Sequence, residues 1–392
     1  MIALSPLVSV ILSAYNHRDY VAESINSVLN QTFRDFEFLI GDDHSTDGTD
    51  DIIRGFSDPR IRAYYQETNT RGCSAFLRSK AAGKYIAVIH SDDIWLPNKL
   101  ETQVAYMEKH PECAACFTHA ALIDEGGNVH ANFDIHNDVF RQPNRTQAEW
   151  LRFFFTSGNC LCHPSILARK EIYIEFEFNR ALRQLPDFQK WISIVKHYPI
   201  YVVQNDLTLH RRLLGACANM SSDLPKNAIR IREEAYFILG TFFDDVSDAL
   251  FTEAFGKLFR DPKASAPAEL LCEKYFLLLD HSMLKGELGK LSAAEFFYRY
   301  CGNRAVLRVL EANYGYSLQD YYTLTGETAL DIPDQNPATK ALSVPAMQSR
   351  LDSLEKAYDS ISRSTIWKLT KPVRTVIDFL KSRRSPNGSR KK

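Results

Sequence analysis

The sequence predicts an α/β fold with a mostly parallel central sheet, followed by a helical C-terminal region. Within the first hundred residues, short β-branched apolar runs alternate with segments whose apolar residues recur at helical spacing. From about Pro225, long helical patterns such as AIRIREEAYFILGTFF replace this alternation. Three predicted strands are followed by polar segments: SAYN, GDDHSTDGT and HSDD. Because parallel strands bring their carboxyl ends to one edge of a sheet, we expect the ligand-binding site there.

The individual elements follow from the spacing of apolar residues. Segment 20–31 repeats them every three or four positions, which is typical of a helix, whereas segment 7–13 is a continuous apolar run. Residues 45–48 supply turn and capping chemistry between a strand and the next helix. In order, we expect strands at 7–13, 36–43, 60–65 and 84–90, and helices at 20–31, around Ile52, Ile53 and Phe56, and at 74–82.

The composition describes an ordinary soluble protein. The formal net charge is -1 and 45% of the 392 residues are hydrophobic, which excludes a disordered chain and gives no reason to expect a nucleic-acid partner. The start, MIALSPLVSVILSAYN, lacks a basic leader, and no apolar run reaches membrane-spanning length. We therefore expect a cytoplasmic protein whose eight cysteines are reduced thiols.

Two cysteine-containing segments could in principle form a zinc site. Cys113 and Cys116 form a C-x-x-C pair, and Cys160, Cys162 and His163 form a second cluster. Both segments are apolar (ECAACF and NCLCHP), and cysteine thiols pack well in the apolar interior that such segments form. We therefore favour core packing over zinc.

The adjacent acids Asp92 and Asp93 follow the apolar strand at 84–90. A buried carboxylate pair costs several kcal/mol unless a cation, hydrogen-bond donors or solvent compensate it. A divalent metal would do so, since Mg²⁺ and Mn²⁺ favour oxygen ligands. Alternatively, the two acids cap the helix that starts near Pro97. This stretch alone supports both interpretations.

Four stretches together resemble the family 2 glycosyltransferases. They are VSVILSAYN, SINSVLNQTFRDFEFLIGDDHSTDGT, AAGKYIAVIHSDDIWLPNKLE and QLPDFQKWISIVKH, and they cover about the first 215 residues in order. The resemblance implies a GT-A fold, a nucleotide-sugar donor lying across the strand ends, inversion at the anomeric carbon, and Mn²⁺ or Mg²⁺ as cofactor. The donor it suggests is a uridine diphosphate sugar.

The resemblance also implies roles for individual residues. Asp92 becomes the metal ligand, because HSDD stands where the family has its D-x-D motif, and Asp187 in QLPDFQKW takes the position of the general base. The implied donor contacts are Ala14 and Tyr15 at the base, Asp42 at the base or ribose, Ser91 and Asp93 at the ribose and sugar, and Arg211 at the phosphates.

The chemistry of the reaction asks for the same groups. A sugar hydroxyl is a weak nucleophile at neutral pH, so a carboxylate such as Asp187 must take its proton. A cation must also neutralise the departing diphosphate, which a metal on Asp92 and the side chain of Arg211 can do. Asp187 has a structural alternative as a first-turn acid of the amphipathic helix that follows it.

The chain departs from the family pattern at several positions. His90 replaces the first acid of D-x-D, Ser13 and Ala14 replace a proline and a threonine, and Leu213 stands where a histidine is common. The segment NTRGCSAFLRSKAAGKY is shortened, so Arg71 and Arg78 receive no role. The His90 substitution motivates an alternative function, a non-catalytic sugar-nucleotide-binding partner of a glycan assembly complex.

We expect four regions along the chain. These are a catalytic domain (1–215), a helical region (216–330), a proline-containing linker (331–345) and a basic amphipathic tail (346–392). In the helical region we expect a core rather than an acceptor-binding stripe from its aromatic side chains: Tyr236, Phe237, Phe242, Phe243, Tyr275 and Phe276.

The tail places apolar and basic residues beside one another at helical spacing, including Ile366, Trp367 and Lys368. This pattern is typical of an interfacial helix and predicts peripheral contact with the inner face of the plasma membrane, close to a saccharide or lipid-linked acceptor. A helix packed on the protein, or a solubilising basic tail, would show the same pattern.

Overall fold

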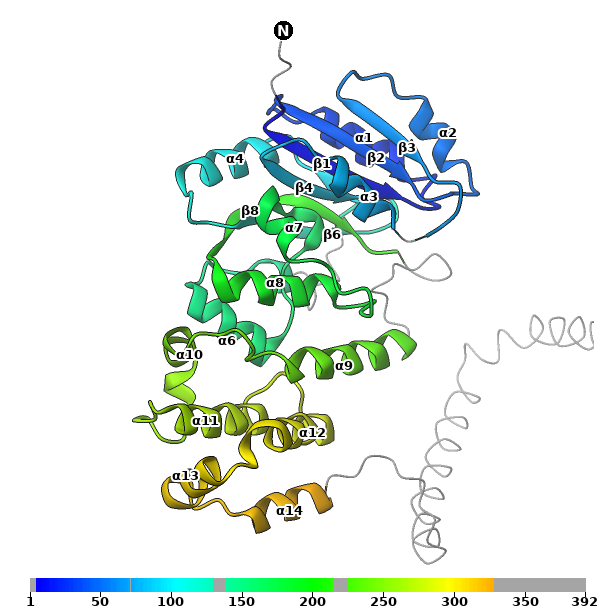
Figure 1. Ribbon diagram of the computed structural model, residues 1–392. Helices are drawn as coiled ribbons and strands as arrows, with labels where there is room; N and C mark the ends of the chain where they lie inside the picture. The colour runs from blue at the N-terminus through cyan, green and yellow to red at the C-terminus, as the bar shows by residue number, and fades with distance from the viewer. Residues whose placement is uncertain (1–4, 71, 130–137, 214–224, 328–392) are drawn as a thin grey trace, which may run out of the picture. The chain divides into compact units, whose positions relative to one another are not determined.

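The computed structural model describes residues 5–70, 72–129, 138–213 and 225–327. Its centre is one eight-stranded sheet with the strand order β3-β2-β1-β4-β7-β6-β8-β5 (Figure 1). The strands are β1 (Val8–Ala14), β2 (Phe36–Asp42), β3 (Ile61–Tyr65), β4 (Tyr85–His90), β5 (Ile94–Trp95), β6 (Ala115–Ile123), β7 (Leu167–Arg169) and β8 (Ile200–Arg211).

Most strands of the sheet are parallel. The pairs β1·β2, β1·β4, β2·β3 and β6·β8 are parallel, whereas β7 runs antiparallel to β4 and β6, and β5 runs antiparallel to β8. The predicted α/β fold with a mostly parallel sheet is therefore confirmed, and the four strands expected in the first hundred residues all form.

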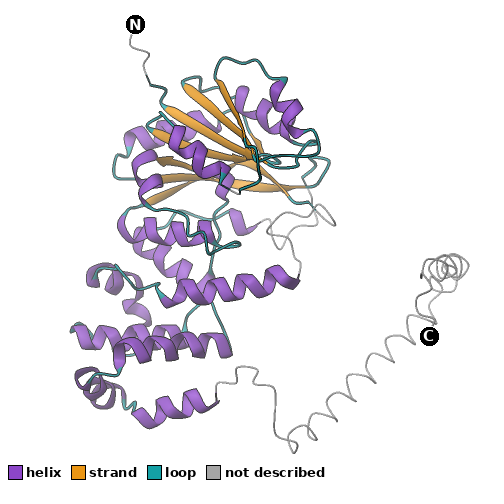
Figure 2. Ribbon diagram, turned by 45° about the vertical axis from the view of Figure 1, so that its right-hand side comes forward, coloured by secondary structure: helices purple, strands orange, loops and turns teal. Residues whose placement is uncertain are grey.

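Helices cover both faces of the sheet (Figure 2). Along β1, Val8, Val10 and Leu12 belong to the core on one face and Ile11 to the core on the other, as the two-residue repeat of a strand requires. The first core includes side chains of α1 (Val21–Leu29), α2 (Thr49–Arg54) and α4 (Lys99–Lys109), and the second those of α3 (Cys73–Lys80), α6 (Gln147–Ser157), α7 (Lys170–Glu175) and α8 (Pro186–His197).

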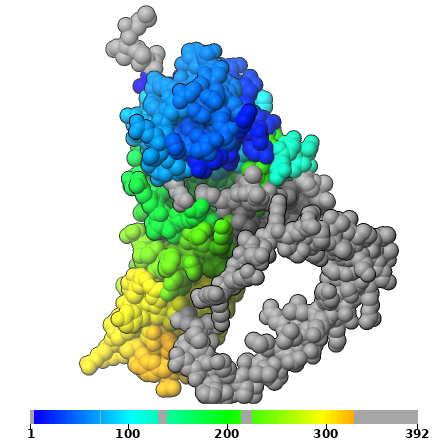
Figure 3. All heavy atoms as spheres, turned by 90° about the vertical axis from the view of Figure 1, so that its right-hand side faces the viewer, coloured from blue at the N-terminus to red at the C-terminus, as the bar shows by residue number. Residues whose placement is uncertain are grey.

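A set of helices follows the sheet in sequence, as predicted. They are α9 (Pro225–Gly240), α10 (Asp248–Phe255), α11 (Pro267–Asp280), α12 (Glu287–Phe296), the π-helix η5 (Phe297–Cys301), α13 (Arg304–Tyr314) and α14 (Leu318–Glu327). In Figure 3 the atoms of these helices, coloured from green to orange, adjoin those of the α/β part without a break. The boundary expected at residue 215 falls within 214–224, and it lies outside the described residues, as do the linker at 331–345 and the tail at 346–392.

The helices share a core with the α/β part. The ring of Phe155 in α6 lies 5.1 Å from the rings of Phe242 and Phe243 and 5.3 Å from that of Phe255. The predicted aromatic core is confirmed for Phe242, Phe243, Tyr275 and Phe276, which are buried. It is wrong for Phe237, which is 61% exposed because it faces away from the buried side of α9.

Within the described residues, no helix combines the length and the apolar character that crossing a membrane would require.

Candidate active site

The carboxyl ends of β1, β2 and β4 meet at one edge of the sheet. Ala14 pairs with Asp42, and Ser13 pairs with His90. The carbonyl of Ala14 also accepts a hydrogen bond of 2.9 Å from the backbone N–H of Asp43. The register of three parallel strands therefore brings Ala14 beside Asp42 and places His90, the residue before Ser91, at the same edge.

The side chains at the ends of β1 and β2 differ in their exposure to solvent. Tyr15 is 45% exposed, whereas Asp42 is buried. The carboxylate of Asp42 accepts from the hydroxyl of Ser45 at 2.5 Å and from its backbone N–H at 2.9 Å. Tyr15 therefore offers an open aromatic surface, while Asp42 shapes the turn that follows its strand.

Ser91 is buried at the end of β4, and its hydroxyl lies 2.7 Å from Nδ1 of His17. The backbone N–H of His17 in turn donates to the hydroxyl of Thr49, the first residue of α2, at 2.9 Å. Side chains after β1 and β4 are thus linked directly, at the edge of the sheet where the sequence predicts that the donor binds.

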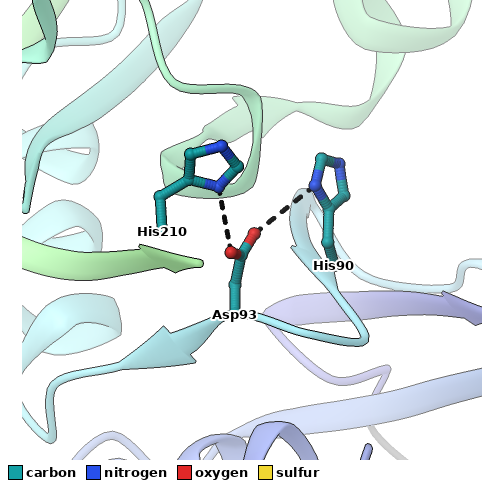
Figure 4. A group of neighbouring side chains, drawn as sticks. All are labelled: His90, Asp93 and His210. Carbon is teal, nitrogen blue, oxygen red and sulfur yellow. Dashed lines mark hydrogen bonds and ion pairs between the residues drawn. The ribbon is translucent and has the colours of Figure 1, made fainter. Parts of the chain in front are cut away.

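Asp93 lies between two histidine rings (Figure 4). Its Oδ1 accepts from Nδ1 of His210 and from the backbone N–H of Arg211, both at 2.9 Å. Its Oδ2 lies 3.4 Å from Nδ1 of His90. The helix-capping interpretation is wrong. The residue before α4 is Asn98, and α4 has no side-chain cap.

The charges of this group influence one another. Burial and the negative charge of Asp93 raise the pKa of Asp92. Burial would also raise the pKa of Asp93, but hydrogen bonds and positive charge from His210 and His90 lower it. Burial would lower the pKa of His90, but the hydrogen bond to Asp93 and the charges of Asp93, Asp92 and Asp187 raise it. All three carboxylates therefore favour the protonated form of His90.

Asp187 is the second residue of α8 and is partly buried. Its carboxylate accepts from the backbone N–H of Phe188 at 2.8 Å and from the amide of Asn159 at 3.2 Å. Burial raises its pKa to about 6, against the effects of these hydrogen bonds and of His90. A carboxylate with this pKa can accept a proton near neutral pH. It also stands in the first turn of α8, so the position alone fits both of its predicted roles.

Arg211 is 1% exposed, and its guanidinium binds protein atoms. Its Nε donates to the carbonyl of Asp92 at 2.8 Å, and Nη1 donates to the carbonyls of Asp124 and Glu125, each at 2.9 Å. Its Nη2 pairs with Glu23 at 2.6 Å. These contacts direct most of the N–H groups of the guanidinium to protein atoms.

The donor set suits a divalent cation. Among the described residues, His90, Asp93 and His210 are the one group of three whose candidate ligand atoms lie within 4.8 Å of one another. Two imidazoles and one carboxylate form a common ligand set for divalent transition metals. The buried neighbour Asp92, whose pKa is raised, would also be stabilised as an anion by such an ion. The residues present therefore fit the implied metal.

The cysteine segments are part of the interior. Cys113, Cys116, Cys160 and Cys162 are buried as free thiols. Burial raises the pKa of Cys113 to about 11 and that of Cys160 to about 12, which disfavours the thiolate that binds zinc. The nearby ring of His163 lies 3.0 Å from the hydroxyl of Tyr173.

Three residues of the site were missed in the sequence: His17, Asn159 and His210. His17 follows a predicted strand and His210 lies near the end of β8, so the rule that ligands bind at strand ends could have singled them out. Asn159 lies between α6 and a short 3₁₀ turn, and no spacing or motif points to it.

Residues 9–175 match the family model described as "Glycosyl transferase family 2". The chain is 41% identical over 242 residues to the "UDP-Glc:alpha-D-GlcNAc-diphosphoundecaprenol beta-1,3-glucosyltransferase WfgD" of Escherichia coli, covering 61% of this chain and 87% of that protein. It is 32% identical over 216 residues to the uncharacterized glycosyltransferase MJ1057 of Methanocaldococcus jannaschii, covering 53% of this chain and 71% of that protein.

The fold also resembles a solved structure. The crystal structure of S. aureus TarS 1-349 superimposes with a TM-score of 0.50 at 17% identity, covering 81% of this chain and 90% of that chain. At this level of identity the likeness concerns the fold alone.

Proposed function

Because the chain belongs to glycosyl transferase family 2, we propose that it is an inverting enzyme that transfers a sugar from a uridine diphosphate sugar to a saccharide or lipid-linked acceptor during bacterial polysaccharide synthesis. The name of the 41% identical relative WfgD contains both a UDP-linked donor and a diphosphoundecaprenol acceptor. One observation carries the proposal most directly. The ring centroid of His163 lies 5.4 Å from that of His90 and 5.6 Å from that of Trp191 in α8, which supports a single site for the strand-end acids and the first turn of α8.

Asp187 is the proposed general base. Its pKa of about 6 leaves the carboxylate ionised at neutral pH yet basic enough to take a proton from a sugar hydroxyl. The amide of Asn159 donates to Oδ2 and the N–H of Phe188 donates to Oδ1, so both oxygens are oriented before the acceptor arrives. In an inverting displacement this base faces the acceptor, on the side opposite to the leaving diphosphate.

The strand ends hold the donor. Ala14 and Tyr15 line the base, with the exposed ring of Tyr15 available for stacking, and Asp42 accepts from the base or ribose. Ser91 is the proposed contact to the ribose or the sugar, whereas the contacts of Asp93 with His210, Arg211 and His90 favour a role at the metal. Arg211 contributes to the phosphate end of the site by holding the carbonyl of Asp92 in place.

A divalent metal completes the proposed site. His90, Asp93 and His210 would hold Mn²⁺ or Mg²⁺, with the neighbouring Asp92 as a proposed further ligand, and the ion would neutralise charge on the leaving diphosphate. His90, Asp93 and His210 lie close together because the segment after β4 leads directly into β5, which pairs with the end of β8. For a lipid-linked acceptor the enzyme would work at the inner face of the plasma membrane.

The test is transfer from UDP-glucose to a GlcNAc-diphospholipid in the presence of Mn²⁺. We expect Asp92→Ala and Asp187→Asn each to lower the rate at least about 100-fold, the usual scale for loss of a general base or a charge-stabilising group. Asp206→Asn is the control, because Asp206 pairs with Arg141 on the surface. Full activity of both site variants would refute the assignment of the site.

A further inference from the structure

Glu234 of α9 binds the backbone directly in front of α8. It is 4% exposed, and its Oε1 accepts from the N–H of Arg183 at 2.8 Å. Its Oε2 accepts from the N–H groups of Gln184 at 2.7 Å and Leu185 at 2.8 Å. One carboxylate thus satisfies three consecutive backbone donors that lie some fifty residues away in sequence.

This contact replaces a local cap for α8. Leu185 precedes the helix and provides no side-chain cap, and Pro186 at the first position has no N–H to donate. A second contact reinforces the first, because the side-chain amide of Gln184 donates to Asn227 of α9 at 3.1 Å. A negative charge at this end of α8 is also favoured by the helix dipole.

The segment that Glu234 holds ends two residues before Asp187. A buried carboxylate with three charge-assisted hydrogen bonds is a strong positional restraint. A shift of this segment moves the first turn of α8, and with it the carboxylate of Asp187. Displacing a catalytic group by about 1 Å can cost on the order of 100-fold in rate.

We propose that Glu234 is a positioning residue, through which α9 of the helical region sets the location of the base Asp187. The inference rests on the proposed function of Asp187. It assigns the helical region a part in catalysis, in addition to its packing against the α/β part.

A matched control separates positioning from simple stability. Glu273 in α11 has a comparable arrangement: it is buried and accepts three hydrogen bonds, from the N–H groups of Arg260 and Asp261, each at 2.8 Å, and from the hydroxyl of Tyr314 at 2.8 Å. These partners belong to the helical region and do not adjoin α8. Glu273→Gln therefore removes an equivalent buried charge without touching the segment in front of Asp187.

In the first experiment, transfer from UDP-glucose is measured for Glu234→Gln and Glu273→Gln, well below both melting temperatures. The amide NH₂ of glutamine cannot accept, so Glu234→Gln releases part of the segment. We expect kcat to fall about 10-fold or more with the KM for UDP-glucose unchanged, and kcat of Glu273→Gln to stay within about twofold of the parent. Equal losses of kcat in both variants would overturn the proposal.

The second experiment is a double-mutant cycle with Asp187→Asn. If Glu234 acts through Asp187, Glu234→Gln has little further effect on the residual rate of Asp187→Asn. A full additional loss in that background would overturn the inference. Undiminished activity of Asp187→Asn alone would instead refute the base assignment, so the two failures can be told apart. If Glu234→Gln does not fold, Asn227→Ala removes the contact to Gln184, and we expect the same lower kcat with unchanged KM.

Discussion

The ring Nδ1 of His210 lies 2.9 Å from Oδ1 of Asp93, although 117 positions separate the two residues in sequence. The contact joins the end of β8 to the residue before β5, and these strands pair antiparallel. It places a second imidazole beside the acids that follow β4.

Replacing Asp93 should destabilise the protein. Asp93→Asn leaves His210, His90 and the N–H of Arg211 without their shared carboxylate, and breaking a buried charged contact of this kind costs about 3 kcal/mol. Urea unfolding measures the loss. Asp206→Asn, which breaks a surface pair with Arg141, should cost less than about 1 kcal/mol. Equal values for the two variants would contradict the buried network.

The rate should depend on pH through Asp187. Burial raises its pKa above the ordinary value of an aspartate to about 6, so the carboxylate is mostly protonated and inactive as a base below about pH 6. We therefore expect kcat/KM to rise with pH up to about 6 and then to level off. The residual rate of Asp187→Asn should lack this acidic limb. A limb that persists in Asp187→Asn would belong to another group.

Arg211→Lys discriminates between two roles of the arginine. The contacts of Arg211 with three carbonyls and Glu23 predict a loss of stability of about 3 kcal/mol, because lysine cannot reproduce the guanidinium fork. The resemblance to the family predicts weaker donor binding instead. Thermal unfolding and the KM for UDP-glucose, measured side by side, decide. Arg141→Lys on the surface is the control, and it should change neither quantity appreciably.

The metal preference should follow the ligand chemistry. With two imidazoles beside Asp93, we expect activity with Mn²⁺ to exceed that with Mg²⁺, since imidazole suits transition metals better than Mg²⁺. Chelation should abolish activity, and adding Mn²⁺ should restore it. His90→Asp should lower the ratio of the two rates, and binding of Mn²⁺ followed by electron paramagnetic resonance provides a readout independent of activity. An unchanged ratio would exclude His90 as a ligand.

The sequence predicted the part of the site that depends on strand order. Ala14 and Asp42 end strands, and Ser91 directly follows one. The apolar runs of these strands are visible in the sequence, and parallel pairing then brings their ends together. Asp187 was singled out by family resemblance, because its local pattern equally fits a first-turn acid.

The residues that were missed depend on distant contacts. His210 meets Asp93 only because β8 lies between β6 and β5, and Glu234 meets residues 183–185 only because α9 lies against the segment in front of α8. Periodicity carries no information about such pairs. The exposure of Phe237 has the same origin, since an aromatic at helical spacing does not reveal which face of a helix finds a partner.

The aromatic contacts of Phe155 with Phe242, Phe243 and Phe255 also limit where chimeras between this enzyme and its relatives can be joined. A chimera joined just after β8 would pair α6 with foreign helices and expose or crowd a face shaped for these three rings. A chimera that folds should therefore take α6 and the helices it contacts from the same parent, so that all four aromatic rings remain matched.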